Sequence, residues 1–124
     1  MKGILIVDHG SVKDEANDML RSMADLIQTM AGPEVVVHYG HMELADPNIA
    51  VGFSSCVDAG ATDVTVFPYM LSPGRHSTSD IPRMVADVAR RFPQVSFSVT
   101  PAFGLHEKLA EVVLERAGLG IHAD

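Results

Sequence analysis

The sequence is short of cysteine, of basic residues and of long apolar runs, and each shortage excludes a class of protein. Its one cysteine, Cys56, has no internal disulfide partner, and its place in an apolar helical pattern predicts a packed thiol in a reducing compartment. Nine Lys and Arg against 16 Asp and Glu give a formal net charge of -7, which opposes binding to phosphate backbones. We therefore expect a cytoplasmic protein that does not bind nucleic acid.

No stretch of the chain approaches the roughly 20 consecutive apolar residues that cross a bilayer. Asp8 and His9 interrupt the first apolar run, so this run predicts a strand and not a secretory signal. A chain of 124 residues is large enough to bury a core without disulfides, and 47% of its residues are hydrophobic. These features predict a single globular domain that has no membrane partner.

Four short apolar runs alternate with segments of helical period. The runs lie at residues 2–7, 34–39, 63–68 and 94–99 and predict strands. The first two are nearly continuous in apolar residues, as central parallel strands are, whereas serines alternate along the last, as in an edge strand. The alternation predicts an open, doubly wound parallel α/β sheet with strand order 2-1-3-4 and helices on both faces. We assign this domain to residues 1–119 and expect residues 120–124 to form a tail.

Capping residues and apolar stripes delimit the helical segments. The first begins at a capping-box-like Ser11 and Asp14, and the second begins at Asp46-Pro47, an acidic cap followed by proline. The apolar stripe of the first helix comprises Ala16, Met19, Leu20, Met23, Ile27 and Met30, and that of the last helix comprises Leu105, Leu109, Val112 and Val113. Such stripes predict helix faces that pack against the sheet.

Ligand-type side chains follow three of the predicted strands. His9 comes directly after the first strand, His41 and Glu43 follow the second, and His76 ends the long loop after the third. In an open parallel sheet, ligands bind beyond the carboxyl ends of the strands, so these side chains share one rim. Imidazole nitrogen suits Fe(II), Co(II), Ni(II) and Zn(II), and a carboxylate can complete an open site with exchangeable positions. We therefore expect His9, His76 and Glu43 to form an incomplete metal site.

Each of these residues also has a purely structural explanation. His9 can simply end a strand, His76 can be a solvated loop residue, and Glu43 can be an ordinary surface carboxylate. For His41 we favour packing or solvent exposure over a part in the site. Asp8 can orient an imidazole or cap the following helix, and the sequence does not choose between these two roles.

Three segments resemble those of one enzyme family, the CbiX/SirB chelatases. They are residues 7–11 (Val-Asp-His-Gly-Ser), 42–47 (Met-Glu-Leu-Ala-Asp-Pro) and 68–76 (Pro-Tyr-Met-Leu-Ser-Pro-Gly-Arg-His), the last followed by Asp80-Ile81-Pro82. The resemblance covers essentially the whole chain in order and spacing, and the last segment is its most specific part. It implies a flavodoxin-like half of a class II chelatase, a family in which long members carry two halves and short members pair as homodimers.

The resemblance also implies an activity and a set of site residues. The activity is the insertion of a divalent metal, namely cobalt, iron or nickel, into a sirohydrochlorin-type tetrapyrrole, with release of two protons and without a permanently bound cofactor. By this analogy His9 and His76 bind the metal, His9 accepts a proton and Glu43 assists. The macrocycle would be lined by Leu44, Leu71, Ser72, Pro73, Gly74, Arg75 and His76, and Arg75 would receive its carboxylates.

Two positions depart from the family pattern. Asp8 stands where glycine often precedes the histidine, which bears on the basicity of His9. His41 stands where an aromatic or apolar residue is expected, which bears on the metal preference.

Two other functions use the same residues. A non-catalytic carrier of metal or tetrapyrrole would use the same rim and would bind its ligand stoichiometrically without turnover. The Asp8-His9-Gly10 segment also resembles a phosphohistidine motif of the phosphoglycerate mutase kind. That chemistry needs an arginine before the histidine and more basic residues to hold phosphate, and the sequence has neither. We therefore keep the carrier as the alternative to the chelatase.

Overall fold

The computed structural model describes residues 1–123 and is built around a four-stranded parallel sheet. The strand order is β2-β1-β3-β4, as predicted. The strands are β1 (Lys2–Asp8), β2 (Val35–His41), β3 (Asp63–Pro68) and β4 (Ser96–Val99). The prediction of a central position was right for β1 and wrong for β2, which lies at one edge. The apolar run of β2 is explained by two helices, α1 (Asp14–Ala31) and α2 (Ile49–Asp58), which pack against this strand.

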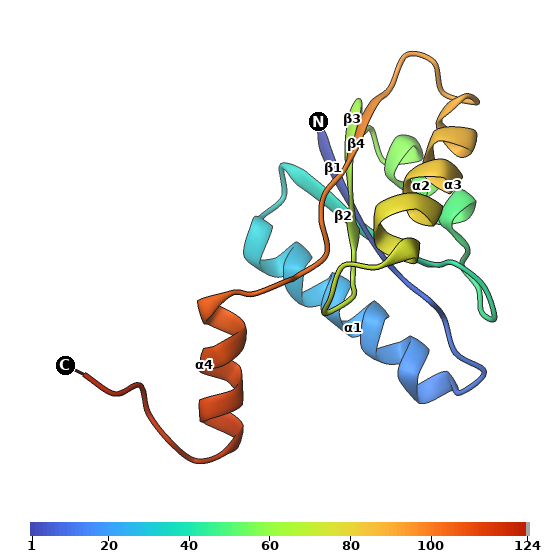
Figure 1. The fold of residues 1–124 in the computed structure, drawn as a ribbon. Helices are drawn as coiled ribbons and strands as arrows, with labels where there is room; N and C mark the ends of the chain where they lie inside the picture. Colours follow the sequence, from blue (N-terminus) through green and yellow to red (C-terminus); the bar gives the residue numbers. More distant parts are fainter. Residues whose placement is uncertain (124) are drawn as a thin grey trace.

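Helices cover both faces of the sheet, as predicted (Figure 1). On one face α1 (Asp14–Ala31) packs on β1 and β2, with Leu20 and Ala24 buried against Ile6 and Val37. On the other face lie α2 (Ile49–Asp58) and α3 (Ile81–Ala89). The larger core is on this second face, and its buried members include Leu5, Phe53, Val64, Val66, Ile81 and Val85.

The details of α1 differ from the sequence-based prediction. Met19 and Met30 of the predicted stripe are 74% and 79% exposed, because the helix contacts the sheet only through a narrower strip around Leu20 and Ala24. The predicted capping box is also wrong, since α1 begins at Asp14 and Ser11 instead exchanges two hydrogen bonds with Asn17.

The cap of α2 also differs from the prediction at Asp46-Pro47. The helix begins at Ile49, and the side chain of Asn48 caps it by accepting a hydrogen bond from the amide of Val51. Asn48 is a favoured N-cap type, so the error was one of position along the chain.

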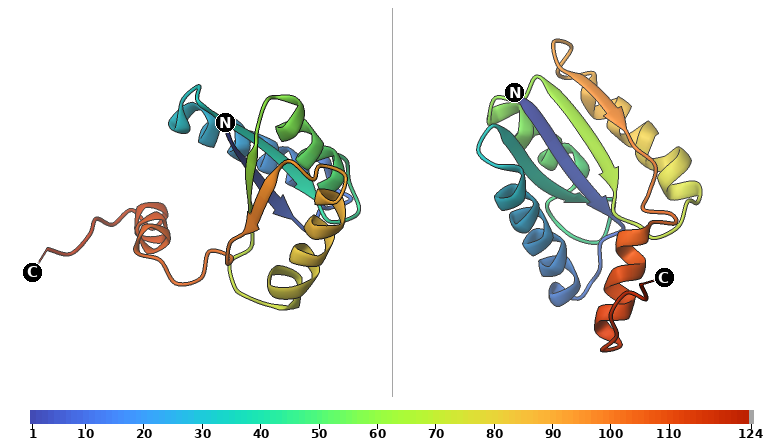
Figure 2. Two further views of the ribbon diagram at one scale, coloured as in Figure 1. Left: turned by 90° about the horizontal axis from the view of Figure 1, so that it is seen from above. Right: turned by 90° about the vertical axis from the view of Figure 1, so that its left-hand side faces the viewer.

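The last helix, α4 (Glu107–Arg116), forms where predicted but does not pack on the sheet of its own chain. Within the described part of the chain no residue of α4 is buried, and Leu105 just before it is fully exposed. Figures 1 and 2 show the helix projecting away from the sheet with the C-terminal segment beyond it. Residues 119–123 contain no helix or strand, and Asp124 of the predicted tail lies outside the described residues.

Cys56 is the packed thiol that the sequence predicted. It is fully buried in the larger core, and burial raises the pKa of its thiol to about 12. Across residues 1–123, the structure contains no helix with the length and hydropathy of a membrane span.

Candidate metal centre

A groove lies at the carboxyl ends of β1 and β3, between the segment that follows β1 and the segment that follows β3. Its volume is about 430 Å³. His9 lines it from the end of β1, and the chain after β3 lines it with Tyr69, Met70, Leu71, Ser72, Pro73, Gly74, His76 and Ser77. Because β1 and β3 are neighbouring parallel strands, their carboxyl ends bring these two distant segments together.

The imidazoles of His9 and His76 meet in this groove. Their ring centroids lie 4.3 Å apart with an interplanar angle of 81°, an edge-to-face arrangement. His9 is exposed, and the His76 side chain is 43% exposed, so both rings can be reached from solvent. Two nitrogens that share one tetrahedral ion at about 2.0–2.1 Å must lie roughly 3.3 Å apart. Small side-chain rotations of two rings at this separation can therefore bring one nitrogen of each to the same cation.

His76 is held by the short helical turn that follows the loop. It begins one π-helical turn, η1 (His76–Asp80), which runs directly into α3. The turn places Asp80 Oδ2 at 3.1 Å from His76 Nδ1, which is ion-pair distance, although the two atoms are not aligned for a hydrogen bond. Arg83 lies 3.5 Å from the other Asp80 oxygen. A carboxylate beside Nδ1 leaves Nε2 as the nitrogen available to a metal.

His9 is held through main-chain bonds between the ends of β1 and β2. The amide of Met42 donates to the carbonyl of Asp8 at 2.9 Å, and the amide of Glu43 donates to the carbonyl of His9 at 3.1 Å. Gly10 has φ +86°, and a Cβ at this position would overlap the carbonyl oxygen of Glu43. The loops that carry His9 and Glu43 are therefore in direct contact.

The side chain of Glu43 does not complete a preformed three-ligand site. Glu43 is exposed, and its hydrogen bond to the His9 loop comes from its main chain. Among the residues that the structure describes, no three His, Cys, Asp or Glu side chains converge as metal ligands. Within this chain the candidate centre therefore consists of two imidazoles.

Two residues of the predicted macrocycle-binding set lie outside the groove. The side chain of Arg75 is 83% exposed and does not line the groove, and its guanidinium lies 3.9 Å from the carboxylate of Asp80. Leu44 has a positive φ of 69° and lines a different pocket on the α1 side of the sheet. The positive φ could not be foreseen, because leucine is rarely found in this conformation.

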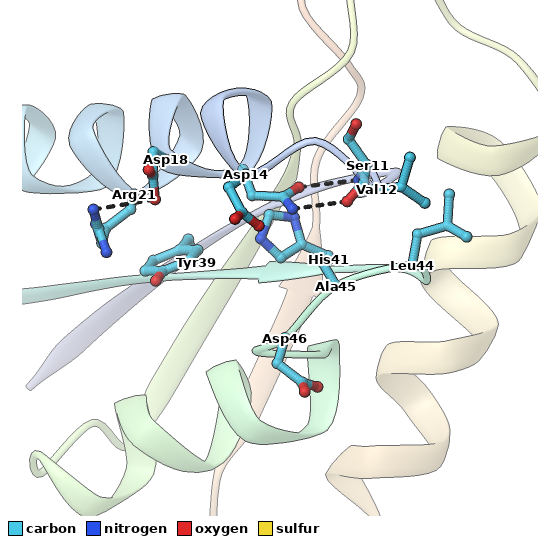
Figure 3. Close-up of a pocket in the computed structure, with 11 residues that line it drawn as sticks. Ser11, Val12, Asp14, Asp18, Arg21, Tyr39, His41, Leu44, Ala45 and Asp46 are labelled. Carbon is cyan, nitrogen blue, oxygen red and sulfur yellow. Dashed lines mark hydrogen bonds and ion pairs between the residues drawn. The ribbon is translucent and has the colours of Figure 1, made fainter.

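The second pocket has a volume of about 430 Å³ and is mostly polar (Figure 3). It lies between the first turns of α1, the end of β2 and the loop around Leu44 to Asp46. His41 lines it, as do Asp14, Asp18, Arg21 and Tyr39, and Arg21 is paired with Asp18 at 3.1 Å. Its acidic lining is unsuited to the carboxylates of a tetrapyrrole.

Tyr69, which lines the groove, and Asp80, which pairs with His76, were given no role by the sequence analysis. Tyr69 lines the groove next to His9, and burial, with a smaller contribution from the negative charge of Asp8, raises its pKa, which keeps the phenol protonated. Asp80 stands beside His76, four residues along the chain. The His-x-x-x-Asp spacing ahead of a helix was the available signal for Asp80, because residues four apart share a helix face.

Comparison with known proteins finds relatives that match nearly the whole chain. The CbiX family profile matches residues 3–118. The chloroplastic sirohydrochlorin ferrochelatase of Arabidopsis thaliana is 44% identical over 114 residues, which cover 92% of this chain and 50% of that protein. The sirohydrochlorin cobaltochelatase of Sulfurisphaera tokodaii is 28% identical over 116 residues, which cover 94% of this chain and 91% of that protein.

The fold is also that of a solved chelatase. The sirohydrochlorin chelatase SirB from Bacillus subtilis subspecies spizizenii, in complex with cobalt, matches with a TM-score of 0.85 at 30% identity, over 94% of this chain and 50% of that chain. This chain therefore spans half the length of the Arabidopsis and Bacillus proteins. The family match over residues 3–118 and the shared fold confirm the resemblance seen in the sequence, and the chain belongs to the CbiX family.

Proposed function

We propose that this chain inserts a divalent metal ion into sirohydrochlorin, with release of two protons from the macrocycle. The observation that carries the proposal is the pair of accessible imidazoles, His9 and His76, at 4.3 Å in one groove. The named relatives are ferrochelatases and cobaltochelatases, which favours iron and cobalt as the metal substrates. Nickel belongs to the proposal because imidazole nitrogen suits all three ions.

In this reaction the two imidazoles hold the ion while the macrocycle nitrogens replace them. Two ligands hold the ion without trapping it, because the remaining positions stay exchangeable. Two pyrrole N–H protons must leave as the two metal–nitrogen bonds to the deprotonated ring form, so the charge balances. His9 accepts the first of these protons on its imidazole, and Glu43 assists from the adjoining loop.

The loop after β3 supplies the surface for the macrocycle. Leu71, Ser72, Pro73 and Gly74 line the groove that contains both imidazoles, and Leu71 is 72% exposed. Arg75, at the outer edge of this loop, receives carboxylates at the rim of the ring, while Leu44 contributes only if its loop moves from the second pocket. The groove is open on one side, so the opposite face of the ring needs a second protein surface.

We propose that a second copy of the chain provides this surface in a homodimer. The C-terminal segment exposes a set of apolar side chains that one protomer leaves uncovered, comprising Leu105, Val112, Val113, Leu119 and Ile121. Exposed apolar sets of this kind mark association surfaces. Phe67, Tyr69 and Phe103 form an aromatic cluster beside the part of the sheet that α1 does not cover. This cluster is a suitable surface for the partner's α4. The double length of two relatives also favours a two-unit enzyme.

A charge on the exposed face of α4 tests this dimer. Val113→Asp is expected to shift the protein from dimer to monomer, because an aspartate cannot be buried against an aromatic surface without losing its hydration. The measurement is molar mass by light scattering after size-exclusion chromatography. Met19→Asp is the matched control, since Met19 is a 74% exposed apolar residue on α1. A wild-type monomer, or a Val113→Asp variant that stays dimeric, would contradict the proposal.

Multiple-turnover kinetics distinguish the chelatase from a carrier. Sirohydrochlorin in large excess over protein, with free Co(II) or Fe(II), is followed by the change in its absorption spectrum. A chelatase converts many equivalents per protein, at a rate above that of the uncatalysed insertion. A carrier that uses the same groove stops at one equivalent, and this result would overturn the proposed function.

Residues 1–119 act as one chelatase unit, and α4 of this unit packs against the partner protomer. A cytoplasmic location is supported by the free thiol of Cys56, which is buried and protonated as in proteins of reducing compartments.

A further inference from the structure

A pair of one histidine and one carboxylate, His41 and Asp8, lies directly beneath the loops that carry His9 and Glu43. The two residues face each other at the ends of β1 and β2, and His41 Nδ1 lies 2.6 Å from Asp8 Oδ1. The imidazole of His41 is fully buried, whereas the Asp8 side chain is 25% exposed. Apolar residues of similar volume would often be as stable at such positions. Stability alone therefore does not account for the pair.

The Asp8 carboxylate also binds the main chain on the far side of His9. Asp8 Oδ1, the same oxygen that contacts His41, accepts a hydrogen bond of 2.9 Å from the amide of Gly10. This Asx turn encloses His9 and fixes its main-chain conformation. The position of the Asp8 carboxylate therefore determines the direction in which His9 leaves the end of β1. The alternative role of Asp8 as a helix cap is excluded, since α1 begins after Lys13.

His41 fixes the Asp8 carboxylate from below. Its ring lies under the first turns of α1, between Tyr39 and the loop of Leu44 and Ala45 (Figure 3). Its main-chain amide donates to the carbonyl of Pro47 at 2.8 Å, which anchors the residue on the side away from β1. A carboxylate accepts hydrogen bonds, so the contact assigns the proton to Nδ1. For Nε2 no hydrogen-bond partner exists within the described residues, and Nδ1 is the nitrogen that makes the bond.

Main-chain hydrogen bonds and a close backbone contact connect Asp8 and His9 tightly to the Glu43 loop. Met42 is bonded to the Asp8 carbonyl, Glu43 is bonded to the His9 carbonyl, and Gly10 is pressed against the Glu43 carbonyl. A displacement of Asp8 by loss of its His41 bond would therefore move His9 and the Glu43 main chain together. His9 would then lose its alignment with His76. The two rings are in contact, but no hydrogen bond within residues 1–123 joins them.

We propose that Asp8 and His41 are positioning residues, which hold the His9 imidazole toward His76 so that the two rings bind one ion. This inference rests on the proposed chelatase function for its purpose, but its geometry concerns only the binding of a divalent ion. Neither residue contacts the groove in which the rings meet. Carboxylate and hydrogen-bond partners behind metal-binding histidines affect metal affinity in this way.

The test measures Co(II) binding to the whole chain, by titration of the visible d–d absorption. His41→Phe keeps the ring volume and removes the donor, and is expected to weaken Co(II) binding by roughly tenfold or more and to change the absorption bands. His41→Asn places an amide donor near the former Nδ1 and is expected to restore most of the affinity. His38→Phe is the matched control, because it changes a histidine of the same strand away from Asp8. Wild-type affinity and spectrum in folded His41→Phe would overturn the proposal.

Substitutions of Asp8 provide an independent pair of variants. Because Asp8 is partly exposed, these variants fold even if His41→Phe, which changes a buried side chain, does not. Asp8→Asn keeps an oxygen that accepts both hydrogen bonds, and Asp8→Ala removes it. We expect Co(II) affinity to fall by roughly tenfold or more in Asp8→Ala and by much less in Asp8→Asn. Equal affinities of the two variants would overturn the positioning role.

Insertion kinetics separate this inference from the proposed function. For His41→Phe we expect a lower kcat with an unchanged KM for sirohydrochlorin, because the macrocycle surface is intact. If the wild type turns over and the Co(II) pattern above is missing, only the positioning role fails. If the Co(II) pattern is present but the wild type does not turn over, the chelatase function fails and the positioning role stands. Absence of Co(II) binding by the wild type contradicts both.

Discussion

Replacing either His9 or His76 with alanine is expected to lower the rate of metal insertion by about a hundredfold or more while the fold stays intact. In the proposed mechanism each imidazole contributes one ligand to the ion, and His9 also accepts a proton. His9 is exposed and the His76 side chain is 43% exposed, so neither substitution opens a cavity in the core. The measurement is the initial rate of Co(II) insertion into sirohydrochlorin, together with thermal unfolding of each variant.

The double variant tests whether the two imidazoles act on the same ion. Since both rings act on one ion, the loss in His9→Ala with His76→Ala should be much smaller than the product of the two single losses. His106→Ala is the control for loss of a histidine, because His106 caps α4 through Nδ1 and lies outside the groove. Near-normal rates in both single variants would refute the assignment.

Replacing Gly10 with alanine is expected to destabilise the protein by about 3 kcal/mol and to abolish insertion. Gly10 has φ +86°, which is unfavourable for alanine, and the new methyl group would also overlap the carbonyl oxygen of Glu43. The chain can relieve this overlap only by separating the His9 loop from the Glu43 loop. The measurement is urea unfolding, combined with the insertion rate of the fraction that folds.

A matched glycine separates the two causes. Gly104 also has a positive φ, of 63°, but within residues 1–123 nothing lies within 4 Å of a Cβ placed there. Gly104→Ala therefore carries only the backbone cost, about 1–2 kcal/mol, and leaves the groove intact. If Gly10→Ala were no more harmful than Gly104→Ala, the close contact between the two loops would not exist in solution.

The sequence was sufficient to predict that His9 and His76 lie at one edge of the sheet, because two simple regularities meet there. Apolar periodicity located the ends of β1 and β3, and parallel strands bring their carboxyl ends to one edge, so His9 and His76 could be expected on the same rim. These regularities predict a shared rim but not a contact between the two rings. The edge-to-face contact of the rings depends on the π-helical turn at His76 and on the Gly10 conformation, which periodicity does not encode.

Other features needed the three-dimensional register. The bond between Asp8 and His41 follows from the exact pairing of β1 with β2, and a shift of one residue would place the two side chains on opposite faces. The stripe on α4 predicted an apolar helix face correctly, but periodicity does not say which surface covers it. Leu44 was expected at the macrocycle because of the family resemblance, but it has a positive φ and lines the second pocket.

The central claim is that one divalent ion is held by His9 and His76 together, and X-ray absorption of bound Co(II) tests it most directly. The extended fine structure counts imidazole ligands through their outer-shell scattering. The account predicts two imidazoles on Co(II) in the wild type, at about 2.1 Å, and one in His76→Ala. The same number of imidazoles in both proteins would contradict it.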